Sequence, residues 1–79
     1  MGGINLMDYY FILYDSLLFS KLIYLNGDPI GICLTGLSSE ADRFFSRLAA
    51  ESYCKSLESL GYLHCFPISF KDWKKKGGK

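Results

Sequence analysis

Apolar residues in the first half of the chain are grouped in three short segments that have the pattern of β-strands. Residues 8 to 15 (DYYFILYD) contain an unbroken apolar or aromatic run, so a strand formed there would be apolar on both faces. Residues 19 to 26 and residues 29 to 36 read as two further strands. Between them, Asn26-Gly27 is the strongest short-range signal for a β-hairpin, because both residues accept a positive φ.

The middle of the chain has the period of an amphipathic helix. Ser38 or Ser39 can cap its start, and Gly61 can end it as the left-handed residue after the last turn. Charged residues fall on the side opposite the apolar stripe. The stripe comprises Ala41, Phe44, Phe45, Leu48, Ala49, Tyr53, Leu57 and Leu60. We therefore expect one long helix that follows Ser38 or Ser39 and ends before Gly61.

Residues 62 to 70 (YLHCFPISF) predict a last strand, and Pro67 places it at a sheet edge or beside a bulge. The order is then β-β-β-α-β, which predicts an α+β domain: a small, mostly antiparallel four-stranded sheet with one long helix on one face. A length of 79 residues allows one domain, which we assign to residues 1 to 70. Residues 71 to 79 read as a basic, flexible C-terminal tail, and residues 1 to 6 as a flexible extension.

Composition and charge exclude several classes of protein. A hydrophobic content of 49% excludes disorder over most of the length, and a net charge of +1 argues against an acidic nucleic-acid mimic and a general nucleic-acid binder. Three cysteines cannot all pair within one chain, which favours a reducing compartment. The apolar run from Tyr9 to Leu25 is interrupted by Asp15 and Lys21, so it predicts no membrane span. We expect a soluble, cytoplasmic protein with no membrane partner.

The only histidine, His64, is followed directly by Cys65 and is the first candidate for chemistry. Neighbouring residues on a strand point to opposite faces, so these two cannot form a thiolate–imidazole pair with each other. No two cysteines have the C-x2-C spacing of a zinc site, and the glycines fit no phosphate-binding motif. We interpret His64 and Cys65 as ordinary strand residues and predict no catalytic residue, no metal, no cofactor and no enzymatic activity.

The second face of the predicted sheet is the feature that bears most on function. One helix can cover only one face, whereas the first and last strands are apolar on both, and monomers rarely expose large apolar patches. Aromatic residues are favoured at the core of protein interfaces. We therefore predict that this face binds another protein or a second copy of the chain. The predicted interface residues are Tyr10, Tyr14, Phe66 and Phe70. The alternative is that the chain's own termini and the SLLF connection fold across the face.

These observations predict a non-enzymatic protein-binding or inhibitor protein that acts through an aromatic sheet surface or a helix edge. Chains of this size without a catalytic set are often inhibitors, adaptors or antitoxins, and small phage-encoded inhibitors of host defence complexes, such as anti-CRISPR proteins, are similar in size. The alternative function is a small nucleic-acid-binding module, in which lysines bind phosphates and an indole stacks on a base. Its residues would be Lys71, Trp73, Lys74, Lys75 and Lys76. The same tail also reads as a solubilising terminus with Trp73 packed against the domain.

Overall fold

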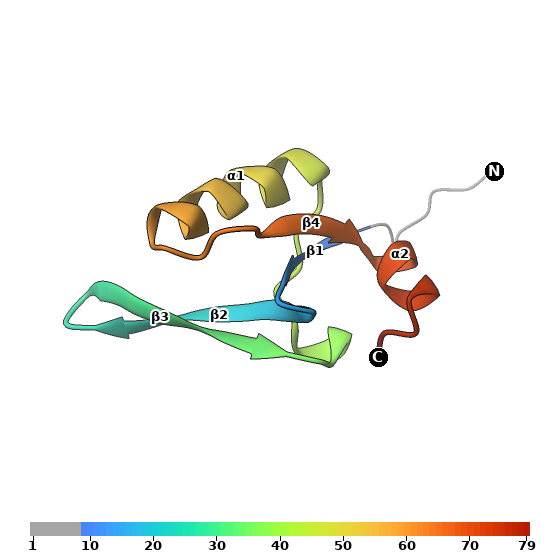
Figure 1. Cartoon of the computed structure of the whole chain (residues 1–79), viewed down its shortest axis with the longest axis horizontal. Helices are drawn as coiled ribbons and strands as arrows, with labels where there is room; N and C mark the ends of the chain where they lie inside the picture. The colour runs from blue at the N-terminus through green and yellow to red at the C-terminus, as the bar shows by residue number, and fades with distance from the viewer. Residues whose placement is uncertain (1–8) are drawn as a thin grey trace.

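A computed structural model describes residues 9–79, and its elements follow the predicted order (Figure 1). The elements are β1 (Tyr10–Tyr14), β2 (Leu17–Leu25), β3 (Asp28–Thr35), the 3-10 turn η1 (Ser38–Glu40), α1 (Arg47–Ser59), β4 (Phe66–Ser69) and α2 (Phe70–Lys75). The strands form one antiparallel sheet in the order β3-β2-β1-β4. The α+β fold and its β-β-β-α-β order are therefore confirmed. The extension predicted for residues 1 to 6 lies outside the described residues.

Both hairpins of the sheet close through two-residue turns with positive φ. The predicted Asn26-Gly27 turn joins β2 to β3, with φ of 53° and 85°. A second turn at Asp15-Ser16, which we did not predict, joins β1 to β2 with φ of 52° and 68°. Positive φ at both central residues is the type I′ pattern, whose twist matches that of the flanking strands. Because the Asp15-Ser16 turn has only two residues, β2 begins at Leu17, two residues earlier than expected.

The chain's two prolines lie one on each edge strand of the sheet. Pro67 is in β4, as its predicted edge position requires, and Pro29 is in β3. The β2–β3 ladder is also irregular near Pro29, because Tyr24 pairs with Pro29 whereas Ile23 pairs with Gly31. Proline offers no N–H to a neighbouring strand, and bulges twist an edge away from one. Both edges are thus poor sites for the addition of a further strand.

Helix α1 covers one face of the sheet, but it is shorter than predicted. It begins at Arg47, where the Ser46 side chain accepts a hydrogen bond from the backbone N–H of Ala49 at 3.0 Å. The expected start at Ser38 or Ser39 is wrong. The backbone of Phe44 pairs instead with that of Tyr10 through N–H···O bonds of 2.8 and 2.7 Å, which holds this segment extended.

The buried side of α1 also differs from the predicted stripe. Ala50, Cys54 and Leu57 face the sheet and pack with Ile12 and Phe19 in one core cluster. The predicted apolar stripe is therefore only partly right. Its members Phe45 and Leu48 are 78% and 73% exposed.

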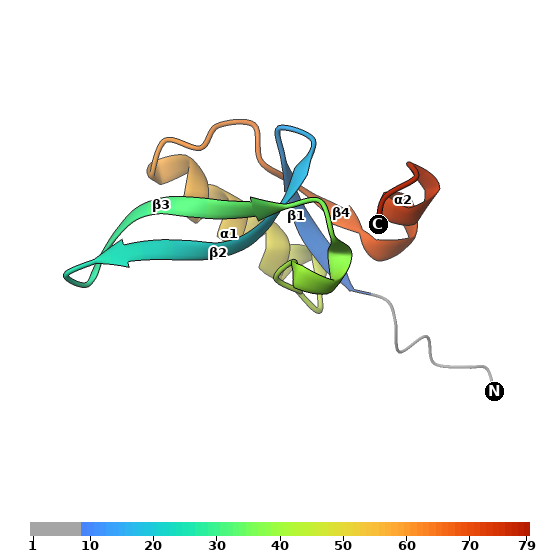
Figure 2. The ribbon, with the colours of Figure 1, turned by 90° about the horizontal axis from the view of Figure 1, so that it is seen from below.

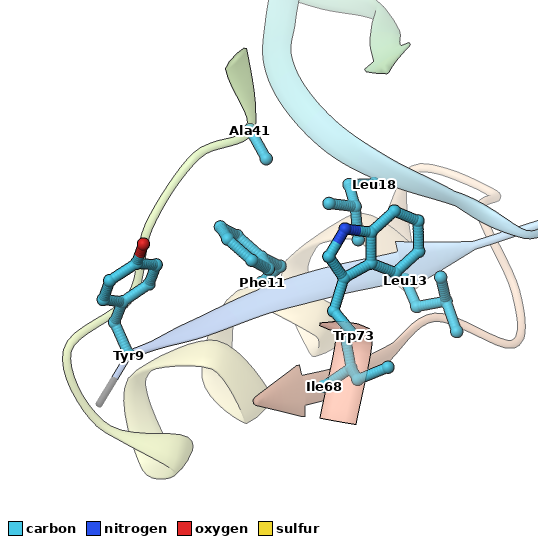
Figure 3. Close-up of a cluster of buried hydrophobic side chains, with 7 residues drawn as sticks. All are labelled: Tyr9, Phe11, Leu13, Leu18, Ala41, Ile68 and Trp73. Carbon is cyan, nitrogen blue, oxygen red and sulfur yellow. The ribbon is translucent and has the colours of Figure 1, made fainter. Parts of the chain in front are cut away.

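The other face of the sheet is covered by the C-terminal segment, for which a basic tail was predicted. Residues Phe70–Lys75 form α2, and Ser69 caps it by accepting a bond from the N–H of Asp72 at 3.1 Å. Trp73 is buried in a second core cluster (Figure 3). That cluster comprises Tyr9, Phe11, Leu13, Leu18, Ala41, Ile68 and Trp73. The domain therefore extends beyond residue 70, and the chain itself covers the second face.

The segment before β4 differs from the predicted strand over residues 62 to 70. Only Phe66–Ser69 pair with β1, and the chain turns at residues 63–64 instead of continuing the strand. His64 has a φ of 69°, a left-handed conformation that a strand does not contain. Our interpretation of His64 and Cys65 as strand residues is wrong, because the chain must turn here to bring β4 beside β1.

Candidate functional site

The four aromatic residues predicted as an interface do not share one surface. Tyr10 and Tyr14 are half-buried on the α1 face, where the Tyr14 ring packs edge-on against that of Tyr62 with centroids 5.8 Å apart. Phe66 lies on the opposite face, because it pairs with Leu13 of the α2-side cluster and paired residues point the same way. Phe70 packs against that same cluster, with its ring 5.1 Å from that of Tyr9. Of the four, only Phe66 is largely exposed, at 52%.

The lysines predicted to bind nucleic acid are exposed near one another, but Trp73, predicted to act with them, is buried. Lys71, Lys74, Lys75 and Lys76 are all exposed on α2 and at its end. Trp73 is 6% exposed and belongs to the core, so its indole is not free to stack on a base. The Lys74 ammonium lies 5.6 Å from the centre of the Phe70 ring, which engages one of the lysines within the chain.

The thiols of Cys54 and Cys65 are buried, and their environment disfavours the reactive thiolate form. Burial raises the pKa of Cys54 to about 11, and the neighbouring Cys65 thiol adds to the effect. Burial also raises the pKa of Cys65, whose Sγ donates a hydrogen bond to the carbonyl of Tyr62 at 3.1 Å. Neither thiol is a thiolate at neutral pH, the form that nucleophilic catalysis needs. Within residues 9–79, no three His, Cys, Asp or Glu side chains come together as metal ligands.

The distal end of the β2–β3 hairpin is exposed and rich in apolar residues. We call residues 23–30, the distal half of the β2–β3 hairpin, the apolar arm. Every residue of the arm is exposed, including Ile23 at 40%, Tyr24 at 58%, and Leu25 and Ile30 at 59% each. Two views show the hairpin tip extending past the end of α1, which packs on β1 and β4 instead (Figures 1 and 2).

The sequence carried a signal for the arm that we did not use. Hairpin tips are usually polar, whereas here Leu25 directly precedes the Asn26-Gly27 turn and Ile30 follows it closely, after Asp28 and Pro29. Such a pattern predicts either a buried hairpin or an apolar surface. Only the length of the hairpin relative to α1 distinguishes the two.

A cavity of about 360 Å³ opens between three segments that are far apart in the sequence. The first is the end of β1 with its turn, the second the turn before β4, and the third α2. We call this cavity the Trp73 pocket, and its lining residues are Leu13, Asp15, Ser16, His64, Phe66, Trp73 and Lys76. Sequence reasoning did not connect these residues, since no local pattern relates them.

Comparison with known proteins supplies no further guide to the site. Within the described part of the chain, no helix has both the length and the hydropathy to cross a membrane. Searches against protein-family models, curated proteins and solved structures give no significant match, so the functional argument rests on the geometry of this chain.

Proposed function

We propose that this protein is a non-enzymatic protein-binding module of the cytoplasm, in the class of small inhibitors and adaptors, and that it binds through the apolar arm. The observation that carries the proposal is the exposure of Ile23, Tyr24, Leu25 and Ile30 on a hairpin end that no other element of residues 9–79 covers. The proposed class is an analogy, based on size, with phage-encoded inhibitors of host defence complexes such as anti-CRISPR proteins.

Two physical arguments support a partner at the arm. An isolated two-stranded hairpin is only marginally stable in water, and every residue of the arm is exposed in the described structure. Full burial of an aliphatic or aromatic side chain contributes roughly 1.5–3 kcal/mol, so covering the exposed part of each arm residue contributes about half of that. Tyr24 adds a hydroxyl beside a broad apolar ring, a combination favoured at interfaces.

The same features indicate how the partner would bind. Pro29 and the irregular ladder near it disfavour pairing of a further strand along β3. The partner is therefore expected to cover the arm's side chains, with Tyr24 and Ile30 as anchors, rather than to extend the sheet. This replaces the predicted surface of Tyr10, Tyr14, Phe66 and Phe70, three of which are at least half-buried.

The test compares capture of host proteins by the wild-type chain and by two matched double variants. Tyr24→Ser with Ile30→Ser changes the arm, whereas Phe45→Ser with Leu48→Ser changes exposed apolar residues elsewhere. Thermal unfolding first establishes that both variants fold. We expect a partner that is retained by the second variant and lost by the first, with each anchor costing about 2 kcal/mol or more in binding. Equal capture by both variants would contradict the proposal.

Self-association is a separate outcome of the same design. The mass in solution, measured by light scattering at low and high salt, decides whether a second copy covers the arm. A dimer that the arm variant alone converts to monomer would identify the partner as the chain itself, whereas a wild-type monomer requires a different protein.

The alternative, a nucleic-acid-binding module, rests on four exposed lysines of the C-terminal segment, Lys71, Lys74, Lys75 and Lys76. It predicts an affinity that falls steeply with added salt, because phosphate contacts release counterions. Gel-shift measurements on Lys74→Gln, Lys75→Gln and Lys76→Gln combined would test it. Retention of wild-type affinity by this variant would exclude the alternative.

A further inference from the structure

The Trp73 pocket has the composition of a small-molecule site. Leu13, Phe66 and Trp73 provide its apolar lining, and four polar side chains complete it. The polar residues are Asp15, Ser16, His64 and Lys76. Ligand pockets typically enclose about 300–1,000 Å³ and combine mainly apolar walls with a few polar groups that orient the ligand. This pocket is at the small end of that range, which limits its occupant to a small molecule.

The two charged residues of the pocket carry opposite signs, and both are unpaired within the described chain. Among residues 9–79, the ion pair is Arg47–Glu51, and the side chains of Asp15 and Lys76 enter no ion pair or hydrogen bond. A ligand with a single negative charge would meet Asp15, and one with a single positive charge would meet Lys76. A ligand that carries both charges would satisfy each of them.

The backbone around the pocket is held in unusual conformations. Four described non-glycine residues have positive φ, and three of them, Asp15, Ser16 and His64, line this cavity. In the β2–β3 turn the second residue is Gly27, which adopts a positive φ without strain. In the β1–β2 turn the same position is occupied by Ser16. A left-handed conformation is less favourable for a residue with a side chain than for glycine, and such strained residues are concentrated at ligand sites.

We propose that the Trp73 pocket binds a small zwitterion with an apolar body, of the class of free apolar α-amino acids. The ligand's ammonium group pairs with Asp15 and its carboxylate with Lys76. Its side chain packs chiefly on Phe66, which is 52% exposed, and on the small parts of Leu13 and Trp73 that remain accessible in the cavity. The proposal is independent of the apolar arm, with which the pocket shares no residue.

The experiment uses the full chain and three probes that share a phenyl body and differ in the charged groups that they carry. L-Phenylalanine carries both charges, 3-phenylpropionate lacks the ammonium, and 2-phenylethylamine lacks the carboxylate. Trp73 is the only tryptophan, so its fluorescence reports directly on the pocket, and amide chemical shifts locate the binding. A charge-assisted hydrogen bond is worth about 1.5–3 kcal/mol, so we expect L-phenylalanine to bind about tenfold more tightly than either analogue.

Two substitutions assign the roles of the charges. Lys76→Gln should weaken L-phenylalanine binding about tenfold and remove its advantage over 2-phenylethylamine. Asp15→Asn should remove its advantage over 3-phenylpropionate, and it preserves the turn because asparagine is favoured at this position. Lys75→Gln, an exposed lysine one residue outside the pocket, is the matched control and should bind like wild type.

Three results would overturn the proposal. The first is the absence of any saturable change in Trp73 fluorescence or in the amide shifts of the pocket with all three probes at millimolar concentration. The second is equal affinity for L-phenylalanine and the singly charged analogues. The third is an equal loss of affinity in Lys75→Gln and Lys76→Gln, which would indicate a general charge effect.

Discussion

Gly78 lies against the indole of Trp73 so closely that a Cβ atom at position 78 would come within 3.0 Å of three indole atoms, Cε2, Nε1 and Cδ2. The backbone holds this contact, because the N–H of Gly78 donates to the carbonyl of Trp73 at 3.0 Å. The Ser38 hydroxyl donates to the carbonyl of Lys79 at 2.9 Å and ties the same segment to η1. Trp73 is thus enclosed between the sheet and the last residues of the chain, and only glycine fits at position 78.

Substitution of this glycine should therefore destabilise the cover of the second face. For Gly78→Ala we expect a loss of about 1–3 kcal/mol in the free energy of unfolding, because the indole or the terminal segment must move. The Trp73 emission should also shift to longer wavelength as the ring gains water. Denaturant unfolding followed by fluorescence and circular dichroism measures both effects. Gly36→Ala, where the nearest atom to the new Cβ is 3.7 Å away, should be nearly neutral, and equal behaviour of the two variants would contradict the prediction.

The cap of α1 can be assigned by a pair of serine substitutions. Ser46→Ala removes the acceptor for the N–H of Ala49 and should cost about 1 kcal/mol. Ser39→Ala, at the start that the sequence alone suggested, should cost almost nothing, because Ser39 is exposed and caps no α-helix. Thermal unfolding of the two variants ranks them. A larger loss at Ser39 would mean that the helix begins at the earlier position.

In the left-handed turn before β2, introduction of a glycine should increase stability, whereas replacement of Gly78 should decrease it. Ser16 has a φ of 68°, and glycine adopts this conformation without the steric cost of a Cβ. We expect Ser16→Gly to raise the free energy of unfolding by about 0.5–1 kcal/mol after the greater freedom of glycine in the unfolded chain is taken into account. Ser16→Ala, which keeps the Cβ, is the control for loss of the hydroxyl. If the glycine variant melts no higher than the alanine variant, the turn is not strained.

Stability should decline at alkaline pH because of the buried thiol of Cys54. Burial raises its pKa from 9.0 to about 11, so above pH 9 the unfolded chain loses this proton while the folded chain keeps it. The unfolded state then binds fewer protons, and stability falls as pH rises from about 9 to about 11. The raised pKa values of Cys65 and Tyr53 act in the same direction. Urea unfolding across this range measures the slope.

The control for this prediction is Cys54→Ala, which lacks the titrating group. Its stability should fall less steeply than that of wild type over the same pH range, although removal of the buried sulfur lowers stability at every pH. Parallel curves for the two proteins would show that the Cys54 thiol does not control the alkaline transition.

Errors in predicting the elements occurred where local signals competed with distant ones. Three serines could each cap a helix, and the earlier two precede an apolar stripe of the right period. The backbone pairing of Phe44 with Tyr10 decides against them, and that pairing joins residues 34 positions apart. Likewise, nothing near Trp73 in the sequence shows that it packs over Leu18 and beneath Gly78.

Contacts between distant segments also determine which candidate site residues are available at the surface. Of the residues chosen from the sequence, the four lysines are exposed, whereas Trp73 and the two β1 tyrosines are packed in the core clusters. The Trp73 pocket could not be found in advance, since its walls come from β1, the turn before β4, and α2.

The order of the elements and the antiparallel sheet could be inferred from local patterns of residues. Those properties follow from hydrophobic periodicity and from the Asn26-Gly27 turn, which act between residues close in the chain. Local patterns did not indicate where α1 begins, what covers the second face, or which apolar residues remain exposed on the arm. These depend on contacts between distant segments, where burial of a side chain such as Trp73 outweighs the local preference of the residues around it.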